Sequence, residues 1–216
     1  MSDTEDNEEL VENKSISSIK QNIINELINT SEESNMASII EIISDLLVKI
    51  CEENKSKKHK RNILLKSFTC KTIPSINIKD YFLRLSKNSK INHSTIIVQL
   101  IYIDRICKMN NVILTYYNIH KLILAAFVLA IKYNEDTYYS NIDYSKIGGV
   151  SVIELNNLEF QYLILIDFKL FVQTELFYKY YNDIMSLKDL NNEEEEEYDE
   201  EYEEENEEEV EDKKVV

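Results

Sequence analysis

Hydrophobic residues recur with a helical period through most of the chain between Ser15 and Ser186. The longest apolar run, Leu122 to Ile131, has no polar side, so a helix that carries it must be enclosed by other helices. The run ends abruptly at Lys132, which places a charge at the mouth of a buried helix. Because the run is only about half of the roughly 20 residues that span a bilayer, we expect no membrane helix.

The pattern predicts five helices between Pro74 and Leu187. Their predicted ranges are 78–86, 92–110, 115–133, 151–167 and 174–186, with the second start at 92 or 94 and the third at 115 or 118. Asn77 is predicted to cap the first helix. The fourth follows a break at Gly148-Gly149, and its start is the most clearly specified, because Ser151 and Glu154 form an S-x-x-E capping box.

Upstream of this region, Ser15 to Ile50 shows weaker helical periodicity. We interpret it as two amphipathic helices separated by the polar break Asn29 to Asn35. The following cluster KSKKHKR, Lys55 to Arg61, is either a solvated linker or a nuclear import signal, and both interpretations are open. We therefore divide the chain into an acidic N-terminus (1–14), an N-terminal helical extension with a basic loop (15–73), a helical domain (74–188) and a tail (189–216).

Composition supports an all-α protein, because two glycines, one proline and no tryptophan leave few residues for the turns of a β-sandwich or barrel. The net charge of −16 is concentrated at the two ends. Residues 191–216 hold 16 acidic residues against two lysines, and residues 1–12 hold six acidic residues and no base. Such a single-sign tail is expected to be disordered. It is either a solubilising extension or a contact for a basic partner.

Motifs for catalysis, metals and cofactors are not found in the sequence. It has no phosphate-binding glycine loop, no G-x-S-x-G, no H-E-x-x-H and no kinase signature. The three cysteines and three histidines show no paired ligand spacing, so we expect free thiols, no metal and no cofactor. We therefore expect a protein that is not an enzyme. The acidic N-terminus does not resemble a signal peptide, which favours a nuclear or cytoplasmic location, or both.

Four segments carry a resemblance to a known family. They are QLIYIDRI (99–106), NIHKLILAAFVLAIKYNEDTYYSN (118–141), YSKIGGVSVIELNNLE (144–159) and FQYLILIDFKLFV (160–172). In order and spacing, residues 74–184 resemble the cyclin box of P-type or U-type cyclins, the phosphate-pathway-like group. The resemblance implies a single five-helix cyclin-box fold, with the N-terminal helices and the acidic tail as additions to it.

The resemblance also implies a kinase-binding site. In cyclins, a lysine at the end of the third box helix and a glutamate in the fifth face the kinase, and these fall on Lys132 and Glu159. The further positions that the resemblance assigns to kinase contact are Tyr133, Asp136, Leu163, Phe168 and Leu170. Other interpretations are open: Lys132 can simply extend from the core to water, the charged pair can serve stability alone, and Leu163 and Leu170 can be core residues.

The implied function is that of a regulatory subunit. It would bind and activate a cyclin-dependent Ser/Thr protein kinase by positioning the regulatory helix of that kinase, without supplying a catalytic group. The alternative is a single-box helical interaction module, or a transcription-related one, that acts through its surface or acidic tail without a kinase. Because the bases of the domain are dispersed, we expect no direct binding of nucleic acid. Asp104 and Arg105 are assigned to bonds within the fold.

Overall fold

The computed structural model describes residues 32–56, 63–89 and 91–188. The chain divides into two units, Met1–Ala37 and Ser38–Val216, and the packing described below lies within the second. Four predicted features lie outside the described residues: the acidic N-terminus, the first amphipathic helix, most of the basic loop and the acidic tail.

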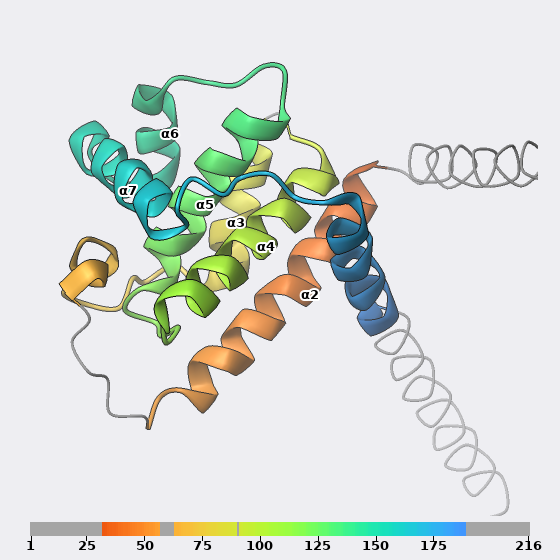
Figure 1. Ribbon diagram of the computed structural model, residues 1–216, viewed down its shortest axis with the longest axis horizontal. Helices are drawn as coiled ribbons and strands as arrows, with labels where there is room; N and C mark the ends of the chain where they lie inside the picture. Colours follow the sequence, from red (N-terminus) through yellow and green to blue (C-terminus); the bar gives the residue numbers. More distant parts are fainter. Residues whose placement is uncertain (1–31, 57–62, 90, 189–216) are drawn as a thin grey trace, which may run out of the picture. The chain divides into compact units, whose positions relative to one another are not determined.

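All regular secondary structure in the described residues is helical (Figure 1). The elements are α2 (Glu32–Glu53), η1 (Ile63–Phe68), α3 (Ile78–Lys87), α4 (His93–Asn110), α5 (Ile119–Asn134), α6 (Asn141–Gly148) and α7 (Val152–Leu165), followed by helical residues 174–188. The all-α class is thus confirmed. In this part of the chain, no helix combines the length and the apolar character that crossing a membrane requires.

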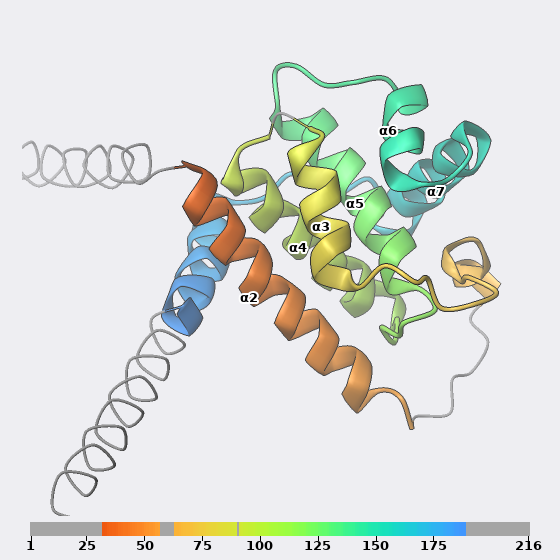
Figure 2. The same ribbon diagram turned by 180° about the vertical axis from the view of Figure 1, so that it is seen from behind.

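Helix α5 is the centre of the core, as its uninterrupted apolar run predicts. Every residue from Leu122 to Ile131 is buried. The helix packs most extensively against α4 and then against α7, with further contacts to α3 and η1 (Figures 1 and 2). Apolar burial on all sides makes this helix a rigid base for the charged residue at its end.

The sequence pattern missed the α-helix α6, as well as the short 3-10 helix η1. The N-cap of α6 is Ser140, whose hydroxyl accepts a hydrogen bond from the backbone N–H of Asp143. It ends at Gly148, and its C-cap Gly149 has a φ of 71°, the left-handed conformation that favours glycine. Our sequence interpretation took the two glycines only as a break and overlooked the helix that they terminate. As a result, α7 is the fifth helix from Pro74, not the fourth.

The predicted caps of α3 and α7 are confirmed. The side chain of Asn77 accepts from the N–H of Asp80, and the hydroxyl of Ser151 accepts from the N–H of Glu154 at 3.1 Å. The carboxylate of Glu154 instead forms an ion pair with Lys121 at 2.8 Å. These contacts set where α7 begins, and hence which of its residues face the core.

Helix α2 begins at Glu32, inside the stretch predicted as a polar break. Its buried side includes Ile39, Ile40, Ile43, Leu47 and Cys51, whereas Leu46 is exposed. Near its end, the amide of Asn54 donates to the carbonyl of Leu114 at 3.1 Å. Burial raises the pKa of the Cys51 thiol to about 11, so this cysteine stays protonated at neutral pH, as expected of a free thiol in the core.

Candidate protein-docking site

Two helices that are separate in sequence bring Lys132 and Glu159 into direct contact. Lys132 lies in the last turn of α5 and Glu159 in the middle of α7. The Lys132 Nζ atom is 2.6 Å from Glu159 Oε1, and the side chains are 26% and 16% exposed. The pair therefore sits at the edge of the core, open to solvent on one side, where a partner can reach it.

A third helix, α6, contributes a hydrogen bond to the same carboxylate. The side-chain amide of Asn141, the first residue of α6, donates to Glu159 Oε2 at 2.7 Å and to Asn156 Oδ1 at 2.7 Å. Both oxygens of Glu159 thus have partners, and three helices fix one carboxylate. Such a fully bonded charge has a defined orientation before any partner arrives.

The local sequence explains why the two charges meet. Leu155, Leu158 and Tyr162 are buried on the core side of α7, and Glu159 lies at the border of that side. Lys132 follows the last buried residue of α5, Ile131, so its aliphatic stem runs along apolar surface while its ammonium reaches the carboxylate. The structure shows that the pair exists, and this geometry suits both a stabilising role and a docking role.

The turn after α7 is held against α4. Asp167 and Phe168 both have a φ of 54°, a left-handed conformation that is uncommon for such residues. The hydroxyl of Tyr102 donates to the carbonyl of Leu170 at 2.7 Å, and the Arg105 guanidinium donates to the carbonyl of Lys169. The turn is therefore ordered by contacts with the core, and it presents Phe168, which is 64% exposed.

The assignment of Asp104 and Arg105 to internal bonds is confirmed. Arg105 also donates to the carbonyl of Phe171 at 3.3 Å. Asp104 forms an ion pair with Lys108 at 2.6 Å and accepts a hydrogen bond from the Tyr180 hydroxyl at 2.5 Å.

The remaining predicted residues differ in their exposure to solvent. Tyr133 follows Lys132 and is 49% exposed, and Leu163 lies one helical turn after Glu159 and is half-buried, as is Leu170. Asp136 is exposed on the segment between α5 and α6. Its neighbour Glu135 has a structural role instead, because it accepts hydrogen bonds from Asn92 and Thr95.

Sequence reasoning missed two residues that shape this surface, Asn141 and Tyr102. Asn141 starts the overlooked helix α6, so the available signal was the Ser140 cap immediately before it. Tyr102 is fully buried in α4 and was indistinguishable from other core positions, because nothing in its spacing indicates a partner 68 residues away.

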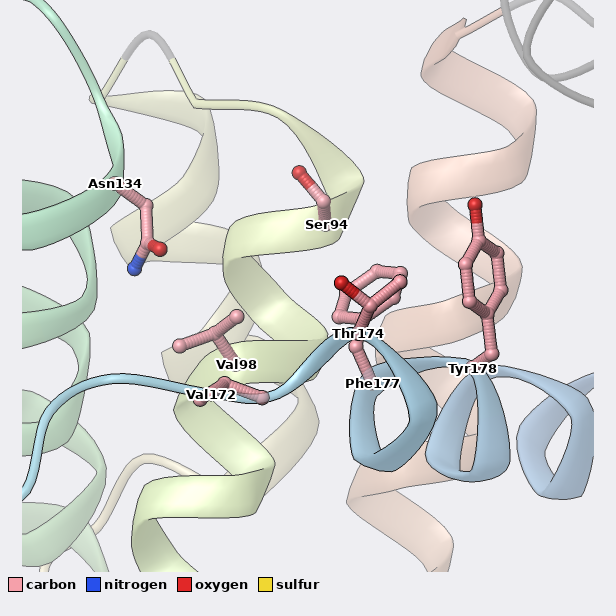
Figure 3. Close-up of a pocket in the computed structure, with 7 residues that line it drawn as sticks. All are labelled: Ser94, Val98, Asn134, Val172, Thr174, Phe177 and Tyr178. Carbon is pink, nitrogen blue, oxygen red and sulfur yellow. The ribbon is translucent and has the colours of Figure 1, made fainter. Parts of the chain in front are cut away.

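A pocket of about 240 Å³ lies beside this surface, where the chain leaves the turn after α7 (Figure 3). It is lined by Ser94, Val98, Asn134, Val172, Thr174, Phe177 and Tyr178. None of the predicted site residues lines it, although Asn134 directly follows Tyr133. The candidate site is thus separate from this pocket and is centred on the Lys132–Glu159 ion pair.

Comparison with known proteins identifies the family. A family model for cyclins matches residues 13–170. The chain belongs to the cyclin family. The matched range includes all the helices from α2 to α7.

Curated relatives give the type of cyclin. Cyclin-U2-1 of Arabidopsis thaliana is 31% identical over 69% of this chain and 68% of that protein. PHO85 cyclin-like protein psl1 of Schizosaccharomyces pombe is 32% identical over 65% of this chain and 64% of that protein. PHO85 cyclin-7 of Saccharomyces cerevisiae is 35% identical over 54% of this chain, which spans about half of that protein.

The protein is therefore a cyclin of the P and U type. Cyclins are regulatory subunits without catalytic activity of their own, and this assignment rests on the family rather than on the absence of a motif. The recognition made from the four sequence segments is thus confirmed. The roles of individual site residues stay predictions.

Proposed function

We propose that this cyclin binds a cyclin-dependent Ser/Thr protein kinase and activates it by holding the kinase's mobile regulatory helix in its inward position. The observation that carries the proposal is the Lys132–Glu159 pair, fixed by three helices, together with the exposed aromatic side chains of Tyr133, next to Lys132 in sequence, and Phe168, on the turn after α7. Aromatic anchors beside a polar group are the usual composition of a protein-binding hot spot. Relatives named as PHO85 cyclins support the same class of partner.

The mechanism is a population shift. A protein kinase requires an ion pair between its nucleotide-lobe lysine and the glutamate of its mobile helix before phosphoryl transfer is competent. A surface that binds the inward arrangement of the mobile helix more tightly than the outward one raises the population of the inward arrangement. The size of this shift is set by the difference between the two affinities. The buried α5 and the anchored turn after α7 provide a surface rigid enough for this selectivity.

The test is capture of cyclin-dependent kinases of the source organism on the purified full chain, followed by a kinase assay on a histone-type substrate. Wild-type chain is expected to retain and activate one such kinase, and Glu159→Lys is expected to abolish both effects. Lys108→Glu is the matched control, since it also breaks a lysine–carboxylate pair, the one with Asp104 on α4. Activation that survives Glu159→Lys would refute this site.

Deletion of residues 193–216 distinguishes the kinase-activating proposal from the alternative, a module that acts through its acidic tail. The kinase-activating proposal predicts that the truncated chain activates the kinase as well as the full chain does. A second arm, a gel-shift assay at low salt, tests nucleic-acid binding, for which no shift is expected. We further propose a nuclear or cytoplasmic location, to be followed with a fluorescent fusion in which residues 55–61 are intact or replaced by alanine.

A further inference from the structure

The outward face of α7 has no free charge. The helix contains two acidic residues and no base, and both carboxylates are in ion pairs, Glu154 with Lys121 and Glu159 with Lys132. The other side chains directed away from the core are uncharged: Ile153, Asn156, Asn157, Phe160, Gln161 and Ile164. A solvent-facing helix surface normally carries charged residues, whereas depletion of charge marks the centre of an interface.

Large apolar side chains occupy this face. Phe160 is 56% exposed and Ile164 is 47% exposed, and the two lie one helical turn apart. Phe168 follows four residues after Ile164, on the anchored turn. Phe160 and Ile164 form an exposed apolar row on the C-terminal half of α7, which we call the α7 row, and Phe168 is exposed on the turn just beyond the helix.

Exposure of the α7 row is not a result of loose packing. The core side of the helix is occupied by buried Leu155, Leu158 and Tyr162, and the turn that carries Phe168 is bonded to α4 through Tyr102 and Arg105. The row is thus held rigidly, which lowers the entropic cost of binding it.

The α7 row is continuous with the proposed docking site. Phe160 directly follows Glu159, and Ile164 directly follows Leu163, so the row lies beside the site along the same helix. In contrast, Ile153 is two turns before Phe160, at the opposite end of α7 from Phe168, although it is 79% exposed. A partner that covers Glu159, Leu163 and Phe168 reaches Phe160 and Ile164 before it reaches Ile153.

We infer that Phe160 and Ile164 extend the kinase-docking surface onto the outer face of α7, where they contact an uncharged apolar patch of the kinase beyond its mobile helix. This inference rests on the proposed function. The two residues would act as affinity and specificity determinants, because a kinase with a charged patch at that position would have to bury the charge without a partner.

The experiment measures binding of the activated kinase to wild-type chain, to Phe160→Gln/Ile164→Gln, to Ile153→Gln and to Glu159→Lys by surface plasmon resonance. Glutamine is a good helix former, so the fold is retained, and this is checked by circular dichroism and melting temperature. The double variant is expected to weaken binding about 30-fold, mainly through faster dissociation, as is typical for loss of two interface anchors. Ile153→Gln is expected to bind as wild type does.

The outcomes separate the two proposals. If Glu159→Lys abolishes binding while the double variant binds as wild type does, the inference is wrong and the proposed function stands. If Ile153→Gln weakens kinase binding as much as the double variant does, the inference is also wrong, since the effect would then not be confined to the α7 row. If the wild-type chain binds no kinase, both the proposed function and the inference fail.

Discussion

The Tyr102 hydroxyl donates a 2.7 Å hydrogen bond to the carbonyl of Leu170, joining the buried helix α4 to the exposed turn after α7. Burial raises the pKa of Tyr102 to about 12, so the hydroxyl keeps its proton and remains a donor at every physiological pH. Together with Arg105, this bond determines the path of the turn that carries Phe168. The geometry of the candidate site is thus set partly from inside the core.

We predict that Tyr102→Phe loosens this turn while the ring continues to fill the core. Loss of the bond should lower the free energy of unfolding by about 1 kcal/mol, and it should accelerate hydrogen exchange in residues 167–171. Affinity for the kinase should fall as well. Tyr81→Phe is the matched control, because the Tyr81 hydroxyl donates to the carbonyl of Gly148, away from this turn. A similar loss of affinity in both variants would show that general destabilisation is the cause.

We predict that Asn141→Asp is more damaging than Asn141→Ala. Alanine removes the hydrogen bonds to Glu159 and Asn156, which should cost about 1 kcal/mol. Aspartate also places a second carboxylate within hydrogen-bond distance of Glu159, so like-charge repulsion adds to that cost at pH 7. Thermal denaturation of the three proteins checks the order. An aspartate variant as stable as wild type would contradict the assignment of Asn141 as the residue that orients Glu159.

We predict that the protein loses stability as the pH falls below about 6.5, the ordinary pKa of histidine, because of His120. This side chain is buried, its Nε2–H donates to the Ile76 carbonyl at 2.8 Å, and its ring lies 5.2 Å from that of Tyr81. Burial lowers the pKa of His120, although its bond to Ile76 opposes the shift. The unfolded chain therefore takes up a proton at a pH where the folded chain does not, and protonation favours unfolding.

The measurement is the free energy of unfolding from urea titrations between pH 5 and pH 7.5. In the wild-type protein, the free energy of unfolding should decline on the acidic side of this range, and His120→Leu should lack this decline. The variant should still be less stable at pH 7.5, because it leaves the Ile76 carbonyl without its partner. Identical slopes in the two proteins would assign the pH dependence to groups other than His120.

The sequence predicted most of the fold, because its strongest signals are local. The apolar run of α5 and the Ser151 cap each depend on residues within one or two turns, and both predictions match the structure. The short helix α6 was missed because eight residues give too little periodicity, and its Ser140 cap was overlooked.

The candidate site was predicted from family resemblance rather than from physical signals. A lysine after an apolar run is visible in the sequence, but its contact with Glu159 depends on how α5 packs against α7. The same reason explains why Asn141 and Tyr102 were missed, since their partners are set by tertiary packing and not by spacing.

The central claim is that Lys132 and Glu159 face a kinase, and a charge swap tests it most directly. The double variant Lys132→Glu/Glu159→Lys restores an ion pair between α5 and α7, so a purely structural role would be rescued in it, whereas a docking surface would be left with both charges inverted. We predict that the swapped protein melts within a few degrees of wild type, is more stable than either single variant, and fails to activate the kinase. Recovery of wild-type kinase activation by the double variant would contradict the account.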